Sequence, residues 1–188
     1  MHFNVKQLYT PTLELYELNE RALVIDTETV GAGPTVEIIE IAFGNAEGEI
    51  VYESLVQPVF NALPPPSKHH RFSRSELRAA PLWRDIWPQV SALIDGRLLV
   101  AYNAAFDRRA FAAECSRYHQ SSNERGWRCA MQLVKKTVGT RRSPTLGEAC
   151  AFYGLEGGNH RAARDVQATC QLLKVLAARK AIGADSQS

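Results

Sequence analysis

Apolar residues in the first half of the chain gather in three short runs that are rich in β-branched side chains, a pattern typical of buried strands. The runs span residues 21–29, 36–45 and 49–58. Glycine-containing turn segments, "VGAGPT" and "NAEGE", separate them. Because a parallel pair of strands needs a longer crossover than these turns provide, the pattern predicts three antiparallel strands.

The second half of the chain carries helical patterns interrupted by one further strand. A proline-rich segment, "NALPPPSK", ends the first strand region, since consecutive prolines disfavour both helix and sheet. A buried strand is predicted at residues 96–103. Helices are predicted at residues 75–79, 83–95, 104–118, 125–137, 145–154 and 163–180. This order of elements indicates an α/β or α+β sheet covered by helices.

The length of 188 residues is enough for one domain with a substantial core. We predict an N-terminal extension over residues 1–20, the domain itself over 21–180 and a flexible polar tail over 181–188. The net charge of +2 excludes a large basic field, so any contact with nucleic acid must come from local clusters.

The cysteines and the hydropathy pattern indicate in which cellular compartment the protein is expected. Four cysteines, at positions 115, 129, 150 and 170, contain no C-x-x-C pair and suit neither a zinc ribbon nor a small disulfide framework. The N-terminal residues lack the apolar core of a signal peptide, and no apolar run approaches the ~20 residues of a membrane span. We therefore expect reduced thiols and a soluble, cytoplasmic protein.

Two carboxylates, Asp26 and Glu28, stand one residue apart at the end of the first apolar run. Alternate residues of a strand point to the same face, so both side chains project together. An unpaired carboxylate is costly to bury. Either the two acids turn outward into water at the strand end, or they hold a cation.

Two later segments pair an acid with a polar residue near the start of a helix. Asn103 and Asp107 lie where the strand at 96–103 turns into a helix, and Asp107 falls in the first helical turn. The glycines before His160 place that residue on a loop, with Asp165 just inside the last helix. A loop histidine beside a fixed acid suits proton transfer next to a metal ligand. Taken singly, each segment is better explained by an acid that complements a helix dipole.

Taken together, the order D-x-E, N-x-x-F-D and H-x-x-x-x-D resembles the DEDDh (DnaQ-like) superfamily of 3′→5′ exonucleases, which includes the proofreading subunit of bacterial replicative DNA polymerase and RNase T. The resemblance runs from Leu23 to Leu176 and is carried by "VIDTET", "LLVAYNAAFDRRAF" and "GNHRAARDVQAT". The segments "VEIIEIAF" and "RSPTLGEACAFYGLE" support it. It implies an α/β, RNase H-like mixed sheet of five strands, three antiparallel and then parallel strands, flanked by helices.

The resemblance implies a metal-dependent 3′→5′ exonuclease that hydrolyses phosphodiester bonds at the 3′ end of single-stranded nucleic acid and releases nucleoside 5′-monophosphates. The string "DTET" is more similar to the DNA-proofreading branch, which favours DNA over RNA. His160 would be the general base. By the same resemblance, two divalent cations, Mg²⁺ or Mn²⁺, would be held by oxygen ligands from Asp26, Glu28, Asp107 and Asp165.

Contacts with the substrate are also implied by the resemblance, at Thr29, Val30, His70, Tyr102, Asn103 and Phe106. Thr29 and Val30 would flank the terminal nucleotide, and Phe106 would pack beneath the site. His70 stands where the family has the histidine of "I-H-G-I-T", although here an arginine replaces the glycine that follows it. Tyr102 either stacks on a base or ends its strand with the hydroxyl at the surface.

Pairs of basic residues recur near these segments: Arg108/Arg109, Lys135/Lys136, Arg141/Arg142 and Arg161/Arg164. They would supply sequence-independent phosphate contacts, or else they form solvated helix faces. A second class of function also stays open, a non-catalytic exonuclease fold that scaffolds a polymerase or another partner. Such a module would be expected to have lost an acid or His160, and all five residues are present. The sequence leaves open both a homodimer and a polymerase partner.

Overall fold

The computed structural model of the protein describes residues 21–63 and 72–185. Its strands are β1 (Ala22–Val30), β2 (Glu37–Gly44), β3 (Ile50–Leu55), β4 (Leu98–Ala101) and β5 (Gly126–Cys129). Its helices are α1 (Arg74–Ala79), α2 (Trp83–Ile94), α3 (Ala104–Arg117), α4 (Ala130–Val138), α5 (Leu146–Phe152) and α6 (Ala162–Asp185), with a 3₁₀ turn at Gly33–Thr35. The predicted extension at 1–20 lies outside the described residues.

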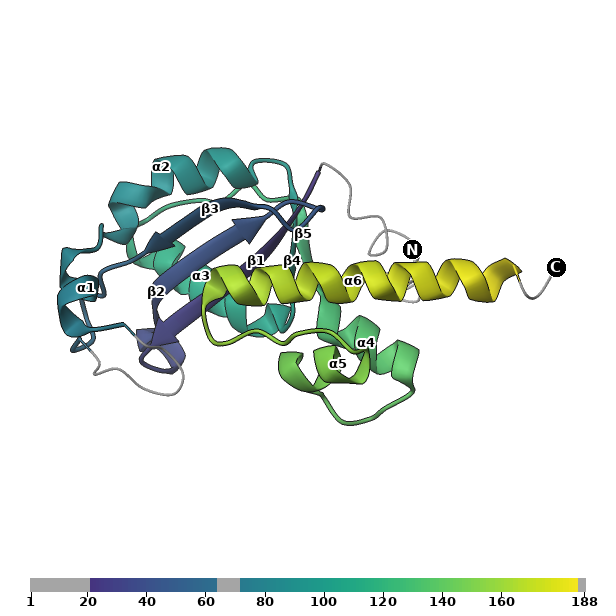
Figure 1. Cartoon of the computed structure of the whole chain (residues 1–188). Coiled ribbons are helices and arrows are strands. Elements are labelled where there is room, and N and C mark those ends of the chain that lie inside the picture. The colour runs from purple at the N-terminus through teal and green to yellow at the C-terminus, as the bar shows by residue number, and fades with distance from the viewer. Residues whose placement is uncertain (1–20, 64–71, 186–188) are drawn as a thin grey trace, which may run out of the picture.

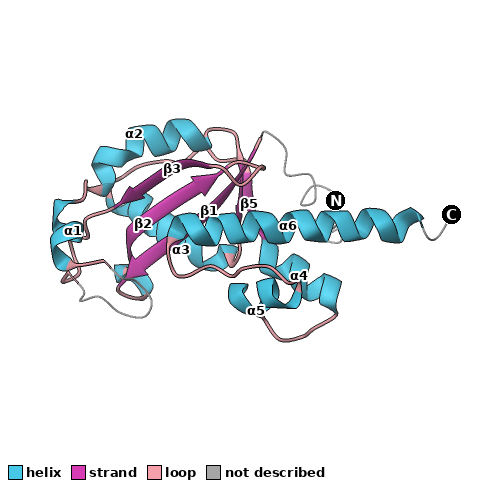
Figure 2. Cartoon of the chain, in the orientation of Figure 1, coloured by secondary structure: helices cyan, strands magenta, loops and turns pink. Residues whose placement is uncertain are grey.

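The strands form one mixed sheet in the order β3-β2-β1-β4-β5 (Figures 1 and 2). The β1–β2 and β2–β3 pairs are antiparallel, as the short turns predicted. The β1–β4 and β4–β5 pairs are parallel, and the chain between β1 and β4 is long enough for the crossover that this requires. The predicted α/β class and the mixed sheet of five strands are confirmed.

One face of the sheet packs against α2 and α3. Alternate residues of β1, Leu23 and Ile25, enter a core that also contains Ile41 of β2. Trp83 of α2 and Phe111 of α3 meet in this core with their ring centroids 5.4 Å apart. The antiparallel strands are therefore held from this side by the two helices that precede and follow β4 in the sequence.

The other face of the sheet packs against α6, which crosses it in Figure 1. Val24 of β1 and Val166 of α6 are fully buried in this second core. A side chain at Gly44 would place its Cβ 2.6 Å from Val166, so the glycine lets α6 lie directly on β2. The buried side chains of Cys170 and Leu173 belong to the apolar face of this helix, which was predicted over residues 163–180. This packing brings the first turn of α6 to the end of β1.

The structure corrects the expected helix at residues 125–137. Its first part is the edge strand β5, and α4 begins only at Ala130. Trp127 pairs with Leu99 of β4, and its side chain packs against the α2–α3 core. A strand of four residues that runs directly into a helix is too short for its alternation to be distinguished from the helical pattern.

The last helix reaches further than the sequence indicated. Its backbone continues to Asp185, into the segment 181–188 that was expected to be a flexible tail, and residues 186–188 lie outside the described part. All four cysteines are free thiols. Among the described residues, no helix combines the length and apolar character needed to span a membrane.

Candidate active site

The end of β1 presents two carboxylates to the α6 side of the sheet. Val24, Asp26 and Glu28 alternate along the strand and share this side, with Val24 inside the α6 core. Glu28 is paired across the ladder with Glu40 of β2. The register shifts directly after Glu28, before Thr29, as in a β-bulge that re-aims side chains at a strand end.

Asp107 approaches the same point from the first turn of α3. The side chain is buried, and its Oδ1 accepts hydrogen bonds from the backbone N–H of Thr27 at 3.0 Å and from the Thr27 hydroxyl at 2.9 Å. Thr27 lies between Asp26 and Glu28 in β1. These two bonds therefore fix the start of α3 beside both carboxylates of the strand.

Asp165 and His160 come from the start of α6 and the loop before it, as predicted. The backbone N–H of Asp165 donates to the carbonyl of Arg161 at 3.0 Å, so Asp165 is in the first helical turn. His160 has a φ of 60°, in the left-handed region that non-glycine residues seldom adopt. At Gly158 a Cβ would lie only 1.7 Å from Oδ1 of Asp165, so a glycine is needed for the loop to pass this carboxylate.

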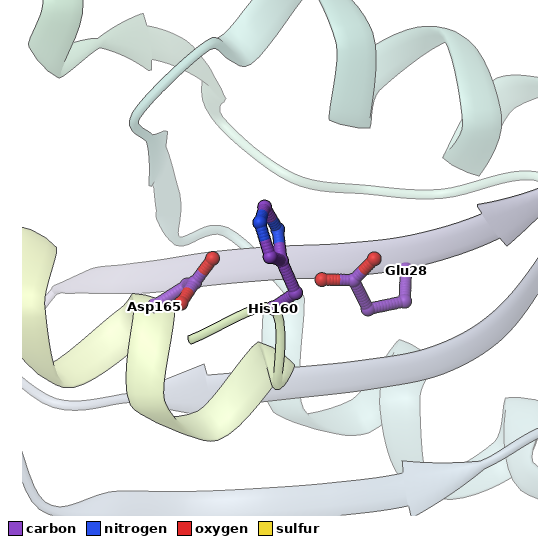
Figure 3. Close-up of side chains that lie close together, drawn as sticks. All are labelled: Glu28, His160 and Asp165. Atoms are coloured by element: carbon purple, nitrogen blue, oxygen red, sulfur yellow. The ribbon is translucent and has the colours of Figure 1, made fainter. Parts of the chain in front are cut away.

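Glu28, His160 and Asp165 converge at the end of β1 (Figure 3). Each of them offers a ligand atom, and these atoms all lie within 4.8 Å of one another. Oδ1 of Asp165 is buried and has no hydrogen-bond partner among the described residues. Because such an oxygen is costly to leave uncompensated, the group is suited to holding a cation. Carboxylate oxygens with one imidazole could hold a divalent metal ion.

Burial raises the pKa of three acids of the site, Asp26, Glu28 and Asp107. Burial raises the pKa of Glu28 to about 8, with further repulsion from Asp165. Burial also raises the pKa of Asp107 to about 7, although the hydrogen bonds from Thr27 oppose the shift. The pKa of Asp26 lies well above its ordinary value through burial and through repulsion from Asp107 and its other acidic neighbours. Near neutral pH these groups need either protons or a nearby positive charge.

Asp165 is the member of the set with the most local compensation. Burial raises its pKa. The electrostatic effect of the His160 imidazole and the hydrogen bonds from the backbone N–H groups of Asn159 and His160 lower it again. The loop before α6 thus faces the carboxylate with donors. The compensation is incomplete, because Oδ1 keeps no partner of its own among the described residues.

Two residues of this region were missed in the sequence. Glu40 of β2 is fully buried and accepts hydrogen bonds from Nε of Arg161 at 2.9 Å and from the backbone N–H of Ala162 at 2.8 Å. Arg161 was named only as a candidate phosphate contact. An acid in the middle of the apolar run "VEIIEIAF", two residues before Ala42 on the same face, was the signal that could have identified Glu40.

The residues predicted to contact the substrate differ in their exposure to solvent. Asn103 begins α3 with no side-chain capping hydrogen bond and is exposed. Phe106 is 39% exposed, and its place beneath the site stays a prediction. Thr29 is half-buried beside the bulge, and Val30 is buried in a small cluster with Phe72. His70 lies outside the described residues.

Both expectations for Tyr102 are corrected. The ring is buried in the α6 core, so it cannot stack on a base. Its hydroxyl donates to the backbone carbonyl of Pro144 at 2.9 Å and lies 3.1 Å from that of Thr145, instead of reaching the surface. Tyr102 therefore ties the end of β4 to the segment before α5. An aromatic residue at a strand end carries no signal that distinguishes these placements.

The basic residues predicted to contact phosphates also differ, because some of them form ion pairs within the protein. Arg142 forms an ion pair with Glu148 at 2.8 Å, and Arg161 is held by Glu40. Arg108, Arg109 and Arg164 are exposed. Arg164 shares a polar hollow beside the start of α6 with Asn159. Phosphate contacts from these exposed side chains stay a prediction.

Comparison with known proteins shows to which family the chain belongs. A family model described as exonuclease matches residues 23–173. The chain belongs to the exonuclease family. This exonuclease is 30% identical over 175 residues to the uncharacterized exonuclease CP81 of Escherichia phage 186, a match that covers 85% of the chain and 90% of the relative. It is 28% identical over 155 residues to the 3′-5′ exonuclease DinG of Staphylococcus saprophyticus, covering 80% of the chain but 17% of that longer protein.

Solved structures agree with the family. Exonuclease X in complex with 5′ overhanging duplex DNA has a TM-score of 0.64 at 26% identity, over 85% of this exonuclease and 93% of that chain. The nuclease domain of 3′hExo, a DEDDh family member bound to rAMP, has a TM-score of 0.68 at 15% identity, over 87% and 94%. The second likeness shows the fold alone. The predicted DEDDh superfamily and the enzyme class, a nuclease that hydrolyses phosphodiester bonds, are confirmed.

Proposed function

We propose that this exonuclease removes nucleotides from the 3′ end of single-stranded nucleic acid, DNA in preference to RNA, and releases nucleoside 5′-monophosphates. The observation that carries the proposal is the convergence of Glu28, His160 and Asp165 within 4.8 Å at the end of β1. Exonuclease X, whose structure contains 5′ overhanging duplex DNA, supports DNA as the substrate class.

Asp26, Glu28, Asp107 and Asp165 would hold two divalent cations, Mg²⁺ or Mn²⁺. The partnerless Oδ1 of Asp165 and the raised pKa values of Asp26, Glu28 and Asp107 support this assignment. Oxygen donors from carboxylates are the ligands that these hard cations prefer. When bound, the cations would stabilise the attacking and leaving oxygens at phosphorus.

His160 would take the proton from the attacking water. Its side chain is exposed on the loop before α6 and lies between Glu28 and Asp165 in Figure 3, so the imidazole can reach solvent and the site together. An imidazole exchanges protons near neutral pH. Asn103 and Phe106, exposed at the start of α3 beside Asp107, would contact the terminal nucleotide, together with Thr29.

The non-catalytic scaffold has no specific observation in its favour. The four acids and His160 are present. Asp107 is buried and the other three acids are half-buried, at a point where a scaffold would have no need of their mutual repulsion. A homodimer and a polymerase partner stay predictions, because one chain is described. Activity on nucleic acid ends is therefore the function to test.

The test is a product ladder from 5′-labelled single-stranded DNA and matched RNA, with Mg²⁺ or Mn²⁺ and with EDTA. We expect shortening from the 3′ end that needs the metal, runs faster on DNA and is lost in an Asp165→Ala variant. A Glu47→Ala variant, which removes an exposed acid in the turn between β2 and β3, is the matched control. Intact substrates under every condition would contradict the proposal, and a faster RNA ladder would overturn the substrate preference alone.

A further inference from the structure

Arg161 follows His160 directly and is held from three sides. Its Nε donates to Glu40 at 2.9 Å, one Nη lies 3.6 Å from Glu53 of β3, and the guanidinium sits over the ring of Phe72 with 4.8 Å to the centroid. A planar guanidinium can satisfy an acid and stack on an aromatic face at the same time. The backbone beside His160 is thereby anchored to β2, β3 and the segment before α1.

Glu40 makes its second contact with α6 itself. Its Oε2 accepts from the backbone N–H of Ala162, the first residue of the helix, at 2.8 Å. That group is one of the N–H donors that a helix leaves unsatisfied at its start. The same buried carboxylate thus fixes the end of the His160 loop and the first turn that carries Asp165.

The ion pair between Glu40 and Arg161 also keeps the charge of Glu40 from adding to that of the site. Glu40 stands opposite Glu28 in the ladder and would add a fifth negative charge to the group. Its ion pair with Arg161, at 2.9 Å, balances that charge. Four carboxylates then remain for the metal ions.

We propose that Glu40 and Arg161 are positioning residues, which clamp the start of α6 to β2 and so set His160 and Asp165 in the geometry that hydrolysis requires. The proposal rests on the proposed function in one respect, the roles of His160 and Asp165. Neither Glu40 nor Arg161 is assigned a contact with the metal ions or the reacting atoms. Supporting residues of this kind typically change metal affinity or activity by about 10–100-fold when they are removed.

The Arg161→Gln variant distinguishes the clamp from a purely electrostatic effect. Its affinity for Mn²⁺ is measured first, by calorimetric titration. Loss of a positive charge beside four acids would, by electrostatics alone, make Mn²⁺ bind more tightly. Loss of the clamp makes Mn²⁺ bind more weakly, by about tenfold, because Asp165 is no longer held. Glu40→Gln should weaken Mn²⁺ binding as well, and Glu53→Gln, which removes only the distant and half-exposed partner, should change it little. Tighter or unchanged binding in Arg161→Gln would overturn the proposal.

Kinetics on a 5′-labelled oligonucleotide separate positioning from substrate binding. The clamp predicts that Arg161→Gln and Glu40→Gln lower kcat by about 10–100-fold and change KM by less than about threefold. It also predicts that Arg161→Gln costs much less when His160 is already replaced by Ala, because the arginine acts partly through that residue. If Arg161 instead bound a substrate phosphate, KM would rise in Arg161→Gln and stay normal in Glu40→Gln.

Hydrogen exchange makes the clamp testable without metal or activity. Peptides that cover residues 157–168 should exchange faster in Arg161→Gln, with the remainder of the sheet unchanged. Arg161→Lys, which keeps the charge but loses the planar fork, is the second variant if Arg161→Gln does not fold, and it should show the same local change to a smaller degree. A wild-type enzyme without nuclease activity would defeat the proposed function alone, whereas unchanged exchange in both variants would defeat the clamp.

Discussion

Buried or half-buried carboxylates occur in two regions of the molecule. One is the turn end of the β1–β2 pair, and the other is the active site, which begins at Glu28, two residue pairs along the ladder from Glu37. At the turn end, Glu37 accepts from the backbone N–H of Val59 and of Asn61, each at 2.6 Å, and from the Asn61 side chain at 2.8 Å. Glu114 of α3 accepts from the N–H of Ile38 at 2.9 Å and pairs with Arg117 at 2.7 Å. Both acids are compensated by the protein itself.

The active-site acids have only part of that compensation, such as the hydrogen bonds from Thr27 to Asp107. Oδ1 of Asp165 has no hydrogen-bond partner within the described ranges, and burial together with repulsion from acidic neighbours raises the pKa of both Glu28 and Asp26. Burial is common to both regions, so burial alone does not identify a metal site. The difference lies in what balances the charge. At the turn end the chain's own hydrogen-bond donors and Arg117 do so, whereas at the site the proposed cations would do so.

The largest expected effect is the loss of activity in Asp26→Asn. Removing a carboxylate that would hold a cation should lower kcat by about 1,000-fold or more, since metal ions supply several kcal/mol of transition-state stabilisation. The same change relieves repulsion, so the metal-free variant should unfold at a higher temperature than the wild type. Initial rates on labelled oligonucleotides and thermal melts with EDTA measure the two effects. An active variant, or a less stable one, would remove Asp26 from the uncompensated group.

The reverse pattern is expected for Glu114→Gln at the turn end. Gln can still accept from Ile38 but no longer balances the charge of Arg117, whose side chain is only 13% exposed, so the free energy of unfolding should fall by about 2–3 kcal/mol. Activity below the melting temperature should stay within about threefold of the wild type. Urea unfolding and the oligonucleotide assay check both statements. A selective loss of activity would show that the two regions are not independent.

A backbone change sharpens the comparison at the site. In Gly158→Ala the new Cβ would lie 1.7 Å from Oδ1 of Asp165, so the carboxylate has to move. A displacement of this size should cost about 100-fold in kcat. Gly147→Ala, at a helical position where a Cβ meets nothing within 4 Å, is the matched control and should keep full activity. Equal rates for both variants would contradict the placement of Asp165.

The smallest effect concerns pH. Folding raises the pKa of Glu28 to about 8 and that of Asp107 to about 7, so the folded state binds more protons than the unfolded chain between their ordinary values and these values. The stability of the metal-free protein should therefore fall as pH rises from about 5 to about 8. Added Mn²⁺ should restore more stability at the upper end of this range than at the lower.

Melting temperatures across this range, with EDTA and then with Mn²⁺, measure the slope and its reversal. Glu28→Gln removes one of the shifted groups and should flatten the curve. A wild-type stability that is constant or rises over the same range in EDTA would contradict the account of the site's acids.

The fold was largely predictable because its main elements have strong patterns. Short turns at residues 30–35 and 45–49 left only antiparallel pairing for the first three strands, and the apolar face of α6 identified the helix that covers them. The edge strand β5 was missed, since four residues that run into α4 contain no complete period of either pattern.

The site was predictable only in part. Spacing and resemblance indicated the acids and His160, because these residues stand at fixed places in three short motifs. Tyr102 was misplaced, since a ring at the end of a strand can turn to either side. Glu40 acts through a contact with Arg161 that spans 121 residues of sequence, which local patterns do not record.

The most direct test of the account is calorimetric titration of the metal-free protein with Mn²⁺, carried out on the wild type, Asp26→Asn and Glu114→Gln. We expect two ions to bind to the wild type and to Glu114→Gln with similar affinity, and binding to Asp26→Asn to be weakened or lost. Equal binding by all three proteins, or no binding by the wild type, would contradict the claim that the uncompensated acids at the end of β1 form a metal site.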